Sequence, residues 1–379
     1  MEYYNNIGMD KKIALYFNGG EKTAYIFDSG QSFRNITVMQ RSNKIVVFDN
    51  VKCEKLFDVE GVVSFKLERD AIVYCNGEYY GAYSYNGKAI LETAYLKISQ
   101  IKDYFKVVDC NQNIGLYHFV NGVLIQIIKP AKYLDIRVQE QGIVVYKEIN
   151  SSKLKGYYSL DGKEIIEPKY VNINFNSDGI YVTTLDDKIG FFSYQGNVIV
   201  PPIYDGINPL NNSFIVYKQT KKGIKKYGLY TKEGAQVLKT RYDGYITKSP
   251  YAIFTIGQLY SVYDLITGKR ILPLKFRNLD IYYNVIYATE DLKTFTLYSA
   301  KTGKKLLDDK FEHVNRYGKY ILKVGIKNKC YYYLTRHNTL LDIDKWSANY
   351  SEEYQEVVIK EKNSNSDGIL YTEWAKYQN

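Results

Sequence analysis

Short runs of alternating hydrophobic and polar residues recur along the chain, and each run ends at a tight-turn sequence. Residues 189–194 alternate in this way, the turn Gln195-Gly196 follows, and residues 198–200 begin a second apolar run. Residues 227–243 repeat the same order and end on an aromatic residue. Period-two alternation bounded by glycine turns is typical of half-buried β-strands joined as hairpins. The pattern therefore predicts an all-β protein.

The turns recur at a near-constant spacing of 30 to 40 residues, which predicts about ten copies of one supersecondary block. Glycine is expected in them because two-residue hairpin turns require positive φ, and asparagine or aspartate is the best substitute. The turn positions that anchor the ten units are Gly19, Asp49, Gly87, Gly122, Gly162, Gly196, Gly234, Gly268, Gly303 and Asn338.

A second landmark supports this alignment, because an aromatic residue stands eight residues after nearly every anchor. The aromatic residues are Phe27, Phe57, Tyr95, Tyr170, Tyr204, Tyr242, Phe276, Phe311 and Trp346, with Tyr133 displaced by an insertion at residues 129–133. We interpret them as packing between neighbouring units. A third strand follows each aromatic residue, and a short fourth strand beside it is an alternative that the pattern leaves open. Units this small must stack to bury their apolar faces.

The repeats divide the chain into three segments: a lead-in at residues 1–12, ten units at 13–362, and a closing strand and tail at 363–379. Residues 368–372 resemble the first strand of an eleventh unit without a hairpin partner. We hypothesise that this strand pairs with the amino-terminal unit and so removes an exposed edge. A β-propeller, as one ring or two sub-rings, is the favoured fold, and an open β-solenoid is the rival.

The central units resemble WG repeats, a bacterial family whose pattern is an aromatic-glycine pair, a strand, a glycine turn, an Ile/Val-rich strand, prolines and Tyr-Asp. Residues 189–206 carry this pattern best, and residues 156–170 and 227–243 follow it closely. The namesake tryptophan is replaced by tyrosine or isoleucine, as at Tyr80 and Ile189. The paired glycine remains at Gly81, Gly115, Gly156, Gly190 and Gly228. The resemblance covers residues 80–245. It implies a propeller-like fold and a binding role, and it transfers no catalytic residues.

Composition adds a basic balance, a net charge of +10 from 51 Lys and Arg against 41 Asp and Glu. The lysines are scattered, whereas a nucleic-acid binder would gather them on one face, so nucleic acid is not the favoured partner. The densest cluster is a loop between strands, which we interpret as a solvated loop, with contact to an acidic partner as the alternative. Its members are the weak binding candidates Lys218, Lys221, Lys222, Lys225 and Lys226.

Residues suited to catalysis or metal binding are sparse. The four cysteines lie far apart, and the three histidines, His118, His313 and His337, show no metal-ligand spacing. The sequence contains no nucleophile elbow, P-loop or zinc-protease motif. Acidic pairs such as Asp186-Asp187 fall in predicted turns. We therefore expect no enzyme activity, no cofactor and no metal.

Three functions remain open at this stage. The first is a protein-binding scaffold, since tyrosine is a favoured interface residue and the chain contains 41 of them. The second is a structural subunit of a homo- or hetero-oligomeric assembly, such as a phage virion, tail or secretion particle. The third is glycan binding through exposed tyrosine rings. No secretory signal or apolar membrane span is apparent, so the expected location is cytoplasmic, or the virion if a phage encodes the chain.

Overall fold

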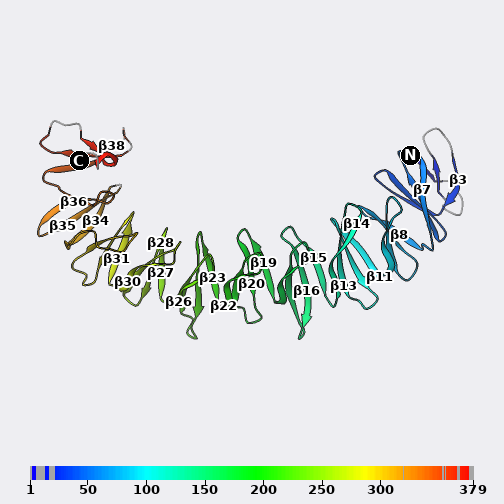
Figure 1. Ribbon diagram of the computed structural model, residues 1–379, viewed down its shortest axis with the longest axis horizontal. Coiled ribbons are helices and arrows are strands. Elements are labelled where there is room, and N and C mark those ends of the chain that lie inside the picture. The colour runs from blue at the N-terminus through cyan, green and yellow to red at the C-terminus, as the bar shows by residue number, and fades with distance from the viewer. Residues whose placement is uncertain are drawn as a thin grey trace. The chain divides into compact units, whose positions relative to one another are not determined.

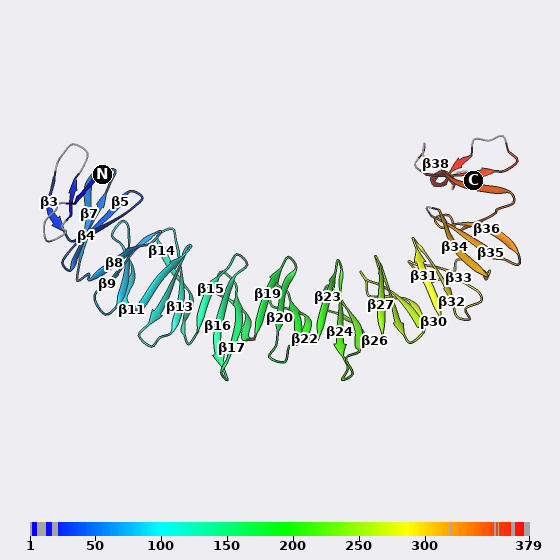
Figure 2. The ribbon, with the colours of Figure 1, turned by 180° about the vertical axis from the view of Figure 1, so that it is seen from behind.

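The computed structural model describes residues 2–5, 13–16, 22–318, 320–351, 354, 356–364 and 368–374. The chain forms two compact units, one of residues 1–186 and 192–197 and the other of residues 187–191 and 198–379. The described residues are almost all strands or turns, so the all-β prediction is confirmed. Within each unit the strands form antiparallel sheets in chain order (Figures 1 and 2).

The first unit contains a three-stranded sheet β1 to β3, a four-stranded sheet β4 to β7, a seven-stranded sheet β8 to β14 and a four-stranded sheet β15 to β18. It ends in β19 and β20. The strands are β1 (Glu2–Asn5), β2 (Ile13–Tyr16), β3 (Lys22–Phe27), β4 (Ser29–Phe33), β5 (Ile36–Arg41), β6 (Lys44–Asp49), β7 (Glu54–Glu60), β8 (Ser64–Leu67), β9 (Ala71–Cys75), β10 (Tyr80–Ser84), β11 (Ala89–Ile101), β12 (Tyr104–Asp109), β13 (Ile114–Val120), β14 (Val123–Ala131), β15 (Asp135–Val138), β16 (Ile143–Ile149), β17 (Ser152–Tyr158), β18 (Glu164–Tyr170), β19 (Asn172–Asn176) and β20 (Gly179–Thr183).

The division between the units falls within the β19 to β22 repeat, and the second unit continues with sheets of four, four, three, four and three strands. The strands are β21 (Ile189–Phe192), β22 (Val198–Tyr204), β23 (Gly206–Leu210), β24 (Ser213–Gln219), β25 (Lys225–Thr231), β26 (Gln236–Tyr242), β27 (Gly244–Lys248), β28 (Tyr251–Ile256), β29 (Leu259–Asp264), β30 (Arg270–Phe276), β31 (Asn278–Tyr282), β32 (Val285–Thr289), β33 (Thr296–Ser299), β34 (His313–Gly318), β35 (Ile321–Ile326), β36 (Lys329–Leu334), β37 (Thr339–Asp342), β38 (Trp346–Ser351), β39 (Glu356–Glu361) and β40 (Ile369–Leu370), and a 3-10 helix, η1, spans Tyr371–Glu373.

Each regular sheet takes its strands from two successive sequence units. In the β23 to β26 sheet, β23 and β24 follow the aromatic residue of one unit, and β25 and β26 flank the glycine turn of the next. The short fourth strand that the sequence left open is thus real and is the first strand of each sheet. Antiparallel pairing in chain order is the arrangement of a propeller blade, and differs from the parallel coils of a β-helix.

Aromatic residues at the recurring position lie between neighbouring sheets, as the sequence predicted. Tyr242 is 1% exposed and packs on Leu229 of its own sheet and on Phe254 of the next. Phe311 is 0% exposed and bridges Leu297 and Leu322 in the same way. Burying such rings contributes about 1.5 to 3 kcal/mol each. The stacking of sheets therefore supplies the core that no single sheet could form.

The glycine turns differ in type from the prediction. Among the anchor turns that the structure describes, only Asn121-Gly122 forms the two-residue turn in which both residues have positive φ, 51° and 74°. At Gly162, φ is +90°, its N–H bonds to the Ser159 carbonyl and the loop spans three residues. The same bonding occurs at Gly87, Gly196 and Gly234. A type I turn closed by a left-handed glycine explains why only the last turn residue requires glycine.

Most turn glycines also dock onto the preceding sheet, a second role that the sequence did not reveal. A Cβ on Gly162 would lie 2.3 Å from the Ile127 carbonyl oxygen, and one on Gly303 would lie 2.2 Å from the Ile271 carbonyl oxygen. Gly122 has nothing within 4 Å of the same position, and its hairpin, β13 to β14, belongs to the same seven-stranded sheet as the preceding repeat. The turn glycines therefore allow close contact between sheets as well as tight turns.

The glycine of the aromatic-glycine pair has a separate packing role. Register shifts in β13 and β17 place Gly115 and Gly156 at bulges opposite the prolines of the fourth strand. A Cβ on either glycine would meet the ring of Pro130 or Pro168 at 2.7 Å. The prolines themselves lie on outer strands, where a missing N–H breaks no ladder bond and discourages pairing with another chain.

Two terminal predictions are refined by the structure. The predicted lead-in contains β1, which pairs with β2, while residues 6–12 and the turn Asn18-Gly19-Gly20 lie outside the described residues. The predicted closing strand is β40, and the partner that the structure describes for it is β39 of its own unit. Tyr371 and Trp374 then bury against this last sheet.

Candidate functional site

The positive charge of the chain is concentrated in the second unit, and this is the strongest candidate for a functional surface. Its residues, 187–191 and 198–379, contain 29 Lys and Arg against 19 Asp and Glu. The remaining residues therefore contain 22 of each sign, from totals of 51 and 41. The first unit is neutral, and the whole excess of ten charges belongs to the second.

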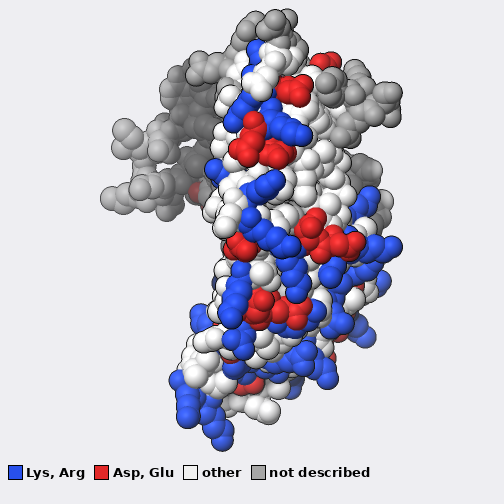
Figure 3. Space-filling model, turned by 90° about the vertical axis from the view of Figure 1, so that its left-hand side faces the viewer, with Lys and Arg blue, Asp and Glu red and all other residues white. Residues whose placement is uncertain are grey.

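The excess is greater still in the region from β22 to β36 and the turn that follows. Residues 198–336 contain 24 Lys and Arg against 10 Asp and Glu. Figure 3 shows one face of the molecule, on which Lys and Arg side chains are widely distributed with Asp and Glu among them. The lysines that the sequence shows as scattered along the chain are thus unequally divided between the two units, and the unit boundary was not visible in the sequence.

The five predicted lysines all belong to one hairpin, β24 to β25, which we call the basic hairpin (residues 218–226). Lys218 is in β24, Lys225 and Lys226 are in β25, and Lys221 and Lys222 are in the turn. The strands pair Lys218 with Lys226 in register. The loop predicted from sequence is thus two strand ends and a short turn, and it projects as one element.

Three of these lysines are held by neighbouring side chains. The ammonium of Lys218 lies 5.3 Å from the Tyr204 ring centroid, and that of Lys225 lies 4.5 Å from the Tyr217 centroid. Such contacts are worth about 0.5 to 1 kcal/mol at exposed sites. Lys226 forms an ion pair with Asp243. These three side chains therefore have structural roles as well as charge.

Asp243 is the aspartate of the Tyr-Asp motif, and its environment explains the motif. Its carboxylate accepts hydrogen bonds from Lys226 and, at 2.7 Å, from the Gly257 N–H in the next hairpin. The hydrogen bond from Lys226 and that from the Gly257 backbone lower the pKa of Asp243. Asp205 repeats this arrangement with Lys188 and the Gln219 N–H. The motif aspartate thus joins one sheet to the next hairpin.

Lys221 and Lys222 differ from their three neighbours. Both are exposed, and neither makes an ion pair or ring contact within the described part of the chain. Their backbone is fixed, because Thr220 and Ile224 bond across the turn and Gly223 supplies a φ of +78°. Two solvated ammonium groups on an ordered turn are suited to contact with an acidic surface.

The tyrosines, by contrast, are mostly used inside the protein. Among the tyrosines whose side-chain exposure the structure describes, only Tyr283, Tyr317 and Tyr354 are exposed. Others form hydroxyl contacts between strands, such as Tyr204 to Tyr230 at 2.8 Å. The high tyrosine content is therefore explained chiefly by sheet packing, and few rings remain to stack on sugars.

The predicted structural anchors are turn glycines and strand tyrosines. Positive φ is found at all seven glycines: Gly87, Gly122, Gly162, Gly196, Gly234, Gly268 and Gly303. Tyr170, Tyr204 and Tyr242 lie at the ends of fourth strands, and Tyr95 lies within β11.

Within the described ranges, no group of three or more His, Cys, Asp and Glu side chains is arranged to hold a metal ion. Over the same residues, no helix has the length and hydropathy required to cross a bilayer.

Comparison with known proteins identifies the repeat. Residues 156–188 and 189–222 match the family model of the WG containing repeat. Each match begins within or at the start of the third strand of one sheet and ends beyond the second strand of the next, so the family repeat has the same offset from the sheets as the sequence units. A search of curated proteins found no match.

Solved structures give distant similarities. The computationally designed Ika8 protein has 13% identity and a TM-score of 0.23, covering 71% of this chain and 95% of that one. A eukaryotic initiation factor has 11% identity and a TM-score of 0.26, covering 74% and 86%. BamB from Moraxella catarrhalis has 12% identity and a TM-score of 0.25, covering 76% and 86%.

Proposed function

We propose that this chain, which contains WG containing repeats at residues 156–188 and 189–222, is a non-enzymatic scaffold that binds an acidic protein through its second unit. The observation that carries the proposal is the charge division: 29 basic against 19 acidic residues in the second unit, and balance in the first. A stable fold does not require this asymmetry, since the first unit forms the same sheets without it.

Charge affects both the range and the specificity of binding. A surface with an excess of one sign of charge raises the local concentration of an oppositely charged partner and speeds its association. The screening length is about 8 Å at physiological ionic strength, so contact depends on lysines at the surface of an ordered element. Lys221 and Lys222 on the basic hairpin meet this requirement. They are the residues that we assign to direct contact.

The non-enzymatic part of the proposal rests on how the buried titratable groups are used. Tyr204 and Tyr242, for example, are buried and pack between sheets. Histidines with described partners serve locally, as His337 does with the Tyr371 carbonyl at 2.8 Å. These groups support packing, whereas catalysis would require them to converge on a reacting atom.

The test is binding of a fluorescent poly-L-glutamate probe to the full chain at low and at physiological salt. Lys221→Glu with Lys222→Glu should weaken binding about tenfold, since each reversed contact costs about 0.5 to 1 kcal/mol. The matched control is Lys129→Glu with Lys132→Glu, which reverses two exposed lysines of the first unit. It changes net charge equally and should alter the affinity less than twofold.

Two outcomes would contradict the proposal. Equal losses in the two double variants would show a general charge effect without a surface. Tighter binding to a DNA duplex than to poly-L-glutamate under the same salt conditions would replace the acidic protein with nucleic acid as the partner.

A further inference from the structure

The repeat formed by β31 to β33 departs from the four-stranded repeats and borders an open pocket. Its sheet has three strands, and the segment that should form the fourth strand makes isolated bridges, from Lys305 to Tyr298 in β33 and from Phe311 to Phe295 just before β33. Between these bridges the chain leaves the sheet. The space that results is a pocket of about 370 Å³, which is within the range of small-ligand sites.

The lysines of this segment stand at positions that are basic in the preceding repeat as well. Counted from the turn glycine, Lys305 takes the position of Arg270 and Lys310 that of Lys275 in β30. Phe311 keeps the position and the burial of the aromatic residue between sheets. The packing role has therefore been kept, and what differs from the preceding repeat is that these two basic residues lie on a segment that leaves the sheet beside a cavity.

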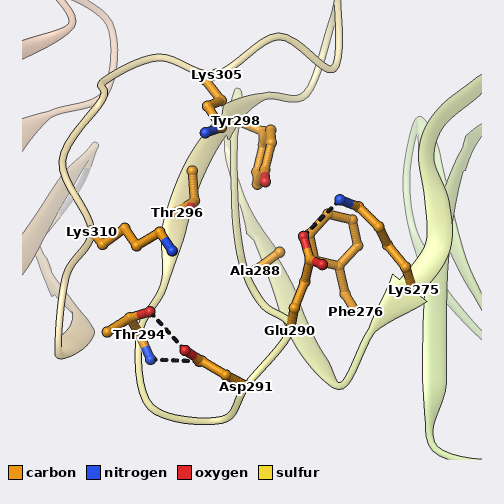
Figure 4. A pocket seen from close by; sticks show the side chains of 10 residues that line it. All are labelled: Lys275, Phe276, Ala288, Glu290, Asp291, Thr294, Thr296, Tyr298, Lys305 and Lys310. Atoms are coloured by element: carbon orange, nitrogen blue, oxygen red, sulfur yellow. Dashed lines mark hydrogen bonds and ion pairs between the residues drawn. The ribbon is translucent and has the colours of Figure 1, made fainter.

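Figure 4 shows Lys305 and Lys310 on the same wall of the pocket, with their ammonium groups directed into it. Neither lysine has an ion-pair partner within the described part of the chain. Thr296, 9% exposed, lies between them on β33, and Tyr298 lies beside it. Two unpaired cations and neutral hydroxyl groups together form a surface suited to an anion.

The two acidic residues of the pocket are already engaged elsewhere. Glu290 forms an ion pair with Lys275 at 2.6 Å, on the side of the pocket opposite Lys305 and Lys310 (Figure 4). Asp291 accepts hydrogen bonds from the N–H groups of Lys293 and Thr294 and from the Thr289 hydroxyl. Asp291 thereby shapes the loop, and neither acid neutralises the two lysines.

A small apolar surface completes the site. Phe276 and Ala288 line the pocket but are each 1% exposed, and the Phe276 ring meets that of Tyr298, which is 9% exposed, edge to face at 5.5 Å between centroids. A bare inorganic ion would leave most of the volume to water. A ligand with an apolar body and one acidic group would use both parts of the site.

We propose that this pocket binds a small organic anion, whose carboxylate or phosphate group lies between Lys305 and Lys310 and whose apolar body lies against Phe276 and Tyr298. The site is in a different repeat from the basic hairpin, so it goes beyond the protein-binding role. It also provides a reason for the loss of the regular fourth strand, since a regular strand would place its side chains where the pocket lies.

The test uses three small probes that share an aromatic body: phenyl phosphate, benzoate and uncharged benzyl alcohol. Saturation-transfer NMR with the full chain should detect one or both anions, and which of them binds more tightly assigns phosphate or carboxylate as the ligand group. Lys305→Met with Lys310→Met should weaken anion binding at least tenfold. Lys301→Met with Lys304→Met, which removes two exposed lysines of the same turn that do not line the pocket, should retain it.

Three results would overturn the proposal. Benzyl alcohol binding as tightly as the anions would reduce the site to an apolar cavity. Equal loss in the two double variants would indicate diffuse charge. Absence of binding by all three probes to a chain with a native circular dichroism spectrum would remove the pocket as a ligand site.

Discussion

Two turn glycines that look alike in the sequence should respond very differently to substitution. Gly162 and Gly122 each have positive φ, +90° and +74°. A Cβ on Gly162 would lie 2.3 Å from the Ile127 carbonyl oxygen on the neighbouring sheet, whereas a Cβ on Gly122 would meet nothing within 4 Å. Substitution at the two positions therefore separates the cost of the turn from the cost of sheet docking.

The magnitudes follow from these distances. Alanine at positive φ costs about 1 to 2 kcal/mol at either site. At Gly162 the backbone oxygen cannot rotate away, so overpacking adds about 1 to 3 kcal/mol. We expect Gly122→Ala to lower the free energy of unfolding by about 1 to 2 kcal/mol, and Gly162→Ala to lower it by about 2 to 5 kcal/mol.

Asparagine separates the two causes further, because it tolerates positive φ but still carries a Cβ. Gly122→Asn should be nearly neutral, while Gly162→Asn should keep most of the docking cost. Urea unfolding followed by circular dichroism gives the overall change. Repeat proteins can lose cooperativity, so hydrogen exchange should also be measured and should accelerate in β14, β17 and β18 in the Gly162 variants. Equal losses for Gly122→Asn and Gly162→Asn would refute the docking role.

Three further predictions concern packing elsewhere. Gly115→Ala should destabilise the chain, because the added Cβ would contact the Pro130 ring. Adding Pro130→Ala should recover part of the lost free energy of unfolding in a double-mutant cycle. Strictly additive losses for the two substitutions would contradict the contact. Burial raises the pKa of Tyr85 to about 12, so Tyr85 ionises at lower pH in the unfolded chain than in the folded one. The free energy of unfolding should therefore fall above about pH 10, measured as alkaline unfolding with tyrosinate absorbance. A free energy of unfolding that stays constant from pH 9 to 12 would contradict this. Trp374→Ala should lower the free energy of unfolding by about 3 to 5 kcal/mol, because the ring is 2% exposed and meets Trp346 edge to face. A change below about 1 kcal/mol in urea unfolding would show that Trp374 is not packed on the last sheet.

Much of the fold could be predicted because its signals are local. Strand alternation, glycine turns and the recurring aromatic residue each lie within one sequence unit, and the structure confirms them as sheets with aromatic residues between them. The cost of a Cβ at Gly162 could not be predicted in the same way. It depends on Ile127, a residue of another sheet, and the spacing of motifs gives no information on that contact.

The candidate sites were less accessible to sequence reasoning, for two different reasons. The charge division required the boundary near residue 187, which only the fold reveals. The pocket residues Lys305 and Lys310 gave no sequence signal, since Arg270 and Lys275 occupy the same positions in a regular fourth strand. They become a candidate site only when the segment is seen to leave the sheet, since isolated lysines on a regular edge strand would be ordinary surface residues.

The offset between sequence repeats and sheets has a consequence for how such a chain changes in length. Removal of one family repeat, such as residues 189–222, takes two strands from each of two sheets, and the remaining halves have the residues to pair as one complete sheet. Unequal recombination between neighbouring repeats could therefore shorten or extend the array without leaving a broken edge. Gene duplication at this period would preserve the hydrogen bonding of every sheet. The number of sheets could therefore change during evolution, while individual sheets, such as that of β31 to β33, take on separate functions.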